Sequence, residues 1–234
     1  MLGLGFSLSL ALRIETGLAA ESGTLGKRMA TLPVLPEPAP GPGGGDWLVS
    51  APPQRAGIFR SHDGKELVLN NGLLSRTWRL APNAATVAFD NLMTDQPVIR
   101  AVRPEAILTI NNVRVAVGGL SGQPNHGYLR KEWLDTMRSS SNALTFVDFE
   151  VGPTQPRLSW KRKRYAVDAP WPPPGMGLTL HFQGNPDLAS SNGPPTRTPL
   201  AVDVHYEIYD GIPLLAKWFT LSNAADESLS LIHI

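Results

Sequence analysis

The 234-residue chain carries 21 basic and 20 acidic side chains, and its formal net charge of +1 provides no field that would attract nucleic acid. It contains no cysteine, which excludes disulfide bonds, thiolate nucleophiles and cysteine-ligated zinc. Its 22 glycines and 22 prolines favour short strands joined by turns, and no stretch reaches the ~18 apolar residues of a membrane span.

Residues 1–46 are expected to precede the folded domain. Leu2 to Leu12 form a short apolar run and Ala19-Ala20 resembles the end of a secretory signal, but a positively charged start is missing. Secretion is therefore one hypothesis, translation from Met29 is another, and the compartment stays open. Residues 32–46 are rich in proline and glycine, which predicts a disordered linker with polyproline II character. We expect no core residue before this linker ends.

From Trp47 onward the chain consists of strand-like apolar runs separated by turn residues. His62-Asp63-Gly64 and Asn70-Asn71-Gly72 are turns of this kind. The stretch TINNVRVAVGG predicts a compact hairpin, because both residues of Asn111-Asn112 tolerate a positive φ. The strands predicted in this half are 58–60, 66–70, 73–80, 84–91, 106–110 and 113–117.

Alternating polarity continues in the second half. In ALTFVDFEVG and GLTLHFQG an apolar side chain recurs at every second position, which is typical of a strand with one buried face. The same alternation runs over residues 202–208, and Asp210-Gly211 supplies a turn into a second apolar run, so this stretch predicts a β-hairpin. We therefore predict an all-β fold, a two-sheet antiparallel β-sandwich over residues 47–225 with long loops and a disordered N-terminal tail.

Other segments interrupt the strand pattern. Residues 126–143 have apolar side chains near helical spacing and predict a short helix or an ordered loop. Residues 151–177 and 184–199 are rich in proline, glycine and serine, so we expect loops that leave one end of the sandwich. Residues 226–234 resemble a truncated or artefactual tail without a partner strand, and we expect the native chain to continue beyond them.

Asp203, His205 and Glu207 form one row of a predicted strand, because they alternate with apolar residues. Such a row can serve an acid/base or metal site, but it is also typical of a half-solvated antiparallel strand, which is far commoner. No HxH or HExxH occurs, so no metal is predicted. The chain also lacks GxSxG, GxGxxG and Walker motifs, so no cofactor is predicted.

Aromatic and polar side chains outside the strands predict carbohydrate binding. Trp171 precedes three prolines, and this stiff segment presents an aromatic plane on which the apolar face of a sugar can stack. The alternative is that Trp171 plugs the end of the sandwich as a core residue. His126, Tyr128, Trp133 and Asp135 are the groups found in carbohydrate clefts, with a plain loop histidine as the alternative for His126.

Residues 159–165 read SWKRKRY, with four cations between two aromatic residues. This composition occurs in surfaces that bind nucleic acid. In a strand or extended loop, however, Lys161 and Lys163 would face opposite to Arg162 and Arg164, which halves the patch. Lysines are also common on solvated edge strands. We favour the solvated edge, and no nucleic-acid partner is predicted.

Three stretches resemble a known family, and they are NGLLSRTWRL (71–80), TVAFDNLMTDQPVIRAVRPEAILTINN (86–112) and above all VHYEIYDGIPLLAKWFTLSN (204–223). They resemble the N-terminal β-supersandwich of α-galactosidase-like glycoside hydrolases. In that family a strand with Y.IYDG.P leads into a strand ending in Asn, just before the catalytic (β/α)8 barrel. The likeness covers about residues 60–225, and related sandwiches occur in galactose mutarotases.

The resemblance implies retaining hydrolysis by two carboxylates of the barrel. Asp203, Glu207 and Asp210 match sandwich positions, so no catalytic residue is assigned and the chain alone is expected to be inactive. The implied role is a non-catalytic domain that supports the barrel and lines its sugar cleft, with a galactose-containing glycan as partner. Two alternatives stay open, a stand-alone carbohydrate-binding module and a mutarotase-like site built from His181, His205 and Glu207.

Overall fold

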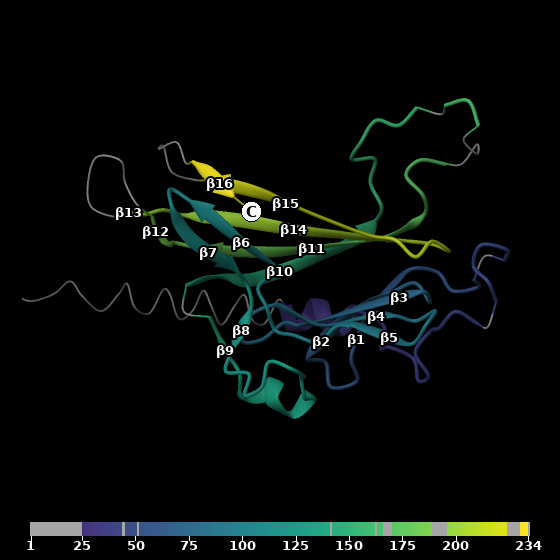
Figure 1. Ribbon diagram of the computed structural model, residues 1–234, viewed down its shortest axis with the longest axis horizontal. Helices are drawn as coiled ribbons and strands as arrows, with labels where there is room; N and C mark the ends of the chain where they lie inside the picture. Colours follow the sequence, from purple (N-terminus) through teal and green to yellow (C-terminus); the bar gives the residue numbers. More distant parts are fainter. Residues whose placement is uncertain are drawn as a thin grey trace, which may run out of the picture.

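The computed structural model consists mainly of two β-sheets that pack face to face (Figure 1). It describes residues 25–43, 45–50, 52–140, 142–161, 163–165, 170–188, 196–223 and 230–233. The predicted secretory signal and most of the predicted C-terminal tail lie outside these residues. The all-β sandwich predicted from the alternating pattern is confirmed.

The first sheet is a five-stranded antiparallel meander in which each strand pairs with the next. Gly64 and Gly72, in the first two connections, have φ angles of +68° and +81°, which glycine adopts without steric cost. The prediction omitted β5, because its exposed Gln96 and Pro97 break the apolar alternation. The strands are β1 (Gly57–Arg60), β2 (Glu66–Asn70), β3 (Leu74–Arg79), β4 (Ala85–Asn91) and β5 (Gln96–Ile99).

The second sheet has seven strands in the order β15-β14-β11-β10-β7-β6-β16. The predicted hairpin between β6 and β7 is confirmed, and its turn residues Asn111 and Asn112 have φ angles of 47° and 63°. The predicted hairpin of β14 and β15 is confirmed as well. The strands are β6 (Ala106–Ile110), β7 (Val113–Val117), β10 (Ala143–Pro153), β11 (Gly175–Gly184), β14 (Leu200–Tyr209), β15 (Leu215–Asn223) and β16 (Leu231–His233).

One pairing in this sheet differs from the antiparallel arrangement that we predicted. β10 pairs with β7 in parallel, with Ala143 opposite Ala116. Parallel neighbours require a long crossover, and the chain between β7 and β10 provides one. It contains the small sheet of β8 (Leu120–Ser121) and β9 (Arg138–Ser139) and the 3-10 helix η1 (Lys131–Thr136), which corresponds to the short helix expected there.

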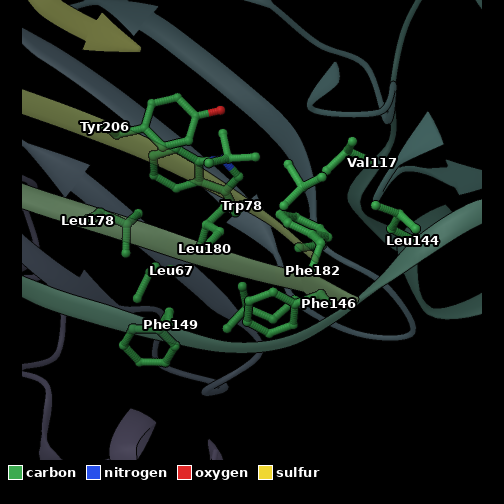
Figure 2. Close-up of a cluster of buried hydrophobic side chains, with 14 of the residues drawn as sticks. Leu67, Trp78, Val117, Leu144, Phe146, Phe149, Leu178, Leu180, Phe182 and Tyr206 are labelled. Carbon is green, nitrogen blue, oxygen red and sulfur yellow. The ribbon is translucent and has the colours of Figure 1, made fainter. Parts of the chain in front are cut away.

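The core lies between the two sheets, where the inward rows of their strands meet (Figure 2). Val202, Val204, Tyr206 and Ile208 of β14 are at most 1% exposed, which confirms the alternation predicted for this strand. Trp78 of β3 is fully buried, and its ring centroid lies 4.9 Å from that of Tyr206. The two largest buried side chains therefore join the sheets directly.

The N-terminal segment contributes to this core, which corrects the expectation that no core residue precedes the end of the linker. Residues 25–31 are helical, and Met29 and Leu32 are buried in the main cluster. Arg28 donates a hydrogen bond of 2.8 Å to the carbonyl oxygen of Phe149 in β10. The segment is under two helical turns long, which is too short for a periodic apolar pattern to be visible in the sequence.

The two long insertions leave opposite ends of the second sheet, not the same end as expected. Residues 154–174 connect β10 to β11, and residues 185–199 connect β11 to β14 with β12 (Asp187–Leu188) and β13 (Thr196–Arg197). Successive connections in an antiparallel meander alternate between its ends, so these two loops are separated by the length of β11. β16 pairs with β6, so residues 231–233 have a partner strand that the sequence did not lead us to expect.

Candidate functional site

The polar row of Asp203, His205 and Glu207 lies on the face of the seven-stranded sheet opposite to the core. A groove of about 410 Å³ opens over this face. The side chains that line it include Arg157, Thr179, His205, Glu207, Trp218 and Thr220. The groove collects residues from β10, β11, β14 and β15 and from the start of the loop 154–174.

His205 is held on both sides of its ring. Its Nδ1 atom lies 3.0 Å from the hydroxyl of Thr179 and its Nε2 atom lies 3.1 Å from the hydroxyl of Thr220. The imidazole stacks on Trp218, with 5.1 Å between ring centroids and 13° between planes, and the guanidinium of Arg157 covers Trp218 at 4.3 Å. Burial lowers the pKa of His205, so the neutral imidazole is favoured.

Glu207 is held by two donors as well. Its Oε2 atom accepts a hydrogen bond of 2.8 Å from the Tyr209 hydroxyl, and its Oε1 atom accepts one of 3.1 Å from the backbone N–H of Gln155. Burial and the hydrogen bond to Glu207 raise the pKa of Tyr209 to about 12. The carboxylate therefore anchors the start of the loop 154–174 to β14.

Asp203 and Asp210 also have partners within the fold. Asp203 lies 2.7 Å from Nδ1 of His181. Asp210 accepts hydrogen bonds from the backbone of Ala56 at 2.7 Å and from Arg55 at 2.9 Å. Among the residues with described positions, no three His, Asp or Glu side chains are grouped so that they could hold a metal ion. The geometry favours the half-solvated strand over an acid/base or metal site.

A buried polar cluster between the two sheets was not found from the sequence. Glu105, which precedes β6, accepts hydrogen bonds of 2.8 Å from the backbone and the hydroxyl of Thr86, and one from the Tyr206 hydroxyl. Lys217 and Arg76 lie 3.2 Å and 3.4 Å from its Oε2 atom. Burial raises the pKa of Glu105, but these charges and hydrogen bonds outweigh burial and the pKa lies below its ordinary value.

The predicted sugar-binding residues of the crossover lie on or near η1. The rings of Tyr128 and Trp133 are 5.2 Å apart, and Tyr128 is 46% exposed. Asp135 pairs with Lys65 at 2.9 Å and with Arg79, and hydrogen bonds from these two residues lower its pKa. His126 is exposed in a loop. Asp135 thus connects the crossover to the first sheet, whereas Tyr128 presents an open surface.

Trp171 lies in the loop 154–174 and is 45% exposed, so it does not plug the core. Its indole N–H donates a hydrogen bond of 2.9 Å to the carbonyl oxygen of Leu158. Its ring stacks on Trp160, which is 42% exposed, with 5.7 Å between centroids and 29° between planes. We call the stacked pair of Trp160 and Trp171 the tryptophan platform.

The platform loop and the crossover do not form one site. Figure 1 shows the loop 154–174 in green beyond one end of the upper sheet. It shows η1 in teal at the bottom of the view, near β9. The structure therefore separates Trp171 from the other four predicted sugar-binding residues. Trp160, which lies within the basic stretch of residues 159–165, is the aromatic partner of Trp171.

Known proteins and membrane segments provide no further assignment. Within the residues that the structure describes, no helix has the length and apolar character needed to cross a membrane. No protein-family model, no curated protein and no solved structure matches the chain.

Proposed function

We propose that the chain is a non-catalytic β-sandwich domain of an α-galactosidase-like glycoside hydrolase, which supports the barrel and presents a carbohydrate-binding surface. The resemblance of residues 204–223 supports the family, and these residues lie in the β14–β15 hairpin and its turn. The observation that carries the carbohydrate part is the exposed tryptophan platform. Its ligand class is a galactose-containing glycan.

The platform has the physical properties of a sugar-stacking surface. The two rings of the stacked pair are each partly exposed, and sugars present apolar C–H faces that pack on an exposed aromatic ring. The hydrogen bond from Trp171 to Leu158 fixes one ring before a ligand arrives. A preformed surface loses little conformational entropy on binding, so more of the contact energy appears as affinity.

The occupied hydrogen-bonding groups on β14 support a non-catalytic role over a mutarotase-like one. Mutarotase-like chemistry needs an acid and a base that reach the sugar. Both ring nitrogens of His205 and both oxygens of Glu207 have partners within the protein. His181 directs Nδ1 to Asp203 and does not line the groove.

Trp171→Ala is expected to weaken binding of a galactose-containing oligosaccharide by ~1–3 kcal/mol, the range seen for bases stacked on aromatic side chains. The free energy of unfolding is expected to change by only about 0.5 kcal/mol, because the side chain is exposed. Calorimetric titration and thermal melting measure the two effects. Val98→Ala, which removes an exposed apolar side chain of β5 outside the loop, is the control and should leave affinity unchanged. A large fall in melting temperature with unchanged affinity would contradict the platform.

The purified chain is expected to show no turnover of an aryl α-galactoside. Glu207, the most buried carboxylate of the row, accepts one hydrogen bond on each oxygen, from Tyr209 and from Gln155, and so serves as an anchor of the loop 154–174. Release of the aryl group is followed by absorbance for the native chain and for Glu207→Gln. Turnover that Glu207→Gln abolishes would place the reaction on β14 and overturn the non-catalytic assignment.

A further inference from the structure

A second groove lies beside the tryptophan platform on the loop 154–174. Its volume is about 420 Å³, and it is lined by Ser159, Trp160, Lys161 and Lys163. We call it the lysine groove. Both lysines are exposed, and the stretch QPRLSWKRKRY over residues 155–165 holds five basic residues and no acidic one. This stretch is far more basic than the chain as a whole, whose net charge is +1.

We propose that the lysine groove binds acidic oligosaccharides, in which carboxylate or sulfate groups project from the sugar rings. Trp160 belongs both to the platform and to the groove, so a sugar stacked on the platform would carry its substituents toward Lys161 and Lys163. The sugar part of this inference rests on the proposed function. The charge of the ligand goes beyond it.

Charge complementarity is the first reason for an acidic ligand. Among the residues that the structure describes, no carboxylate forms an ion pair with Lys161 or Lys163. Both lysines are exposed, and each ammonium group can donate up to three hydrogen bonds to anionic oxygens.

The position of the lysines is the second reason. Alternation along an extended strand or loop puts Lys161 and Lys163 on the same side, because they are two positions apart, and both lie outside the strands. Lys161 and Lys163 consequently line one groove. Nucleic acid is the less suitable ligand, because its affinity grows with the number of phosphates contacted along a track, whereas here a single groove of sugar size adjoins one aromatic pair.

The test titrates the chain with trigalacturonate, a sulfated galactan oligosaccharide and neutral galactotriose. We expect at least one acidic ligand to bind about tenfold more tightly than the neutral one at low ionic strength, since surface ion pairs contribute up to ~1 kcal/mol each. The preferred acidic ligand identifies carboxylate or sulfate. The advantage should vanish near 1 M salt, where the Debye length is about 3 Å.

Lys161→Ala/Lys163→Ala should remove this advantage and leave neutral binding unchanged. Arg103→Ala/Arg114→Ala, which removes two exposed cations outside the loop, is the matched control and should have no effect. Equal binding of acidic and neutral ligands would overturn the inference and leave the proposed function standing. Failure of all three ligands to bind would overturn both this inference and the carbohydrate-binding part of the proposed function. Tighter binding of oligothymidylate than of any sugar would assign the groove to nucleic acid.

Discussion

Glu105→Ala is expected to lower the free energy of unfolding by about 3–5 kcal/mol, the usual loss when one partner of a buried charge pair is removed. Glu105 has a side chain that is only 1% exposed and lies between Arg76 and Lys217. Without the carboxylate, Arg76, whose side chain is 11% exposed, would keep its charge with little access to water. The Tyr206 hydroxyl and the Thr86 backbone would lose an acceptor as well.

Urea denaturation measures this loss. Glu150→Ala is the matched control, because Glu150 is a carboxylate of the seven-stranded sheet whose side chain is 70% exposed. That variant should change the unfolding free energy by about 0.5 kcal/mol or less. Equal losses in the two variants would show that the buried cluster does not hold the sheets together.

The same cluster determines how stability responds to acid. The folded pKa of Glu105 lies below its ordinary value of 4.5, so the folded state favours the carboxylate. Its contribution is therefore complete above the ordinary pKa and is lost as pH falls through the folded pKa. Thermal melting between about pH 7 and pH 3 should show a shallower loss of stability for Glu105→Gln than for the native chain.

Trp78→Ala is expected to cost about 3–5 kcal/mol of unfolding free energy, because it would empty a large space in the centre of the core. Trp78 is 0% exposed, packs against Tyr206 and lies 5.4 Å below the guanidinium of Arg76. Chemical denaturation measures the effect, with Trp171→Ala as the control for loss of an exposed indole. A loss below about 1 kcal/mol would mean that the sheets close over the vacancy, which contradicts a close-packed interior.

The strands were predictable because each has one buried face. The buried row within residues 202–208 was predicted correctly from its alternation. The turn at Asn111-Asn112 was predicted correctly because both residues tolerate a positive φ. The parallel pairing of β7 with β10 was not predictable, because alternation reports which face is buried and not which strand is the neighbour. Met29 and Leu32 were missed because a short helical turn leaves no periodic pattern.

The candidate site was harder to predict, because it depends on contacts between distant residues. Trp171 was selected correctly as an exposed aromatic, but its partner Trp160 lies across a loop whose path the sequence does not specify. Arg76 did leave a signal, since it occupies an inward position between Leu74 and Trp78. A charge at such a position requires a buried counter-charge, and only the fold identifies it as Glu105.

Lys217 has a consequence for how the protein behaves among other copies of itself. It lies on β15, an edge strand of the seven-stranded sheet. Its side chain nevertheless points inward, and its ammonium group donates a hydrogen bond of 2.5 Å to the backbone oxygen of Glu105. A strand added by a neighbouring molecule along β15 would enclose this ammonium group in a continuous sheet and restrict its hydration. The residue that completes the interior cluster thereby also discourages edge-to-edge aggregation of the sandwich.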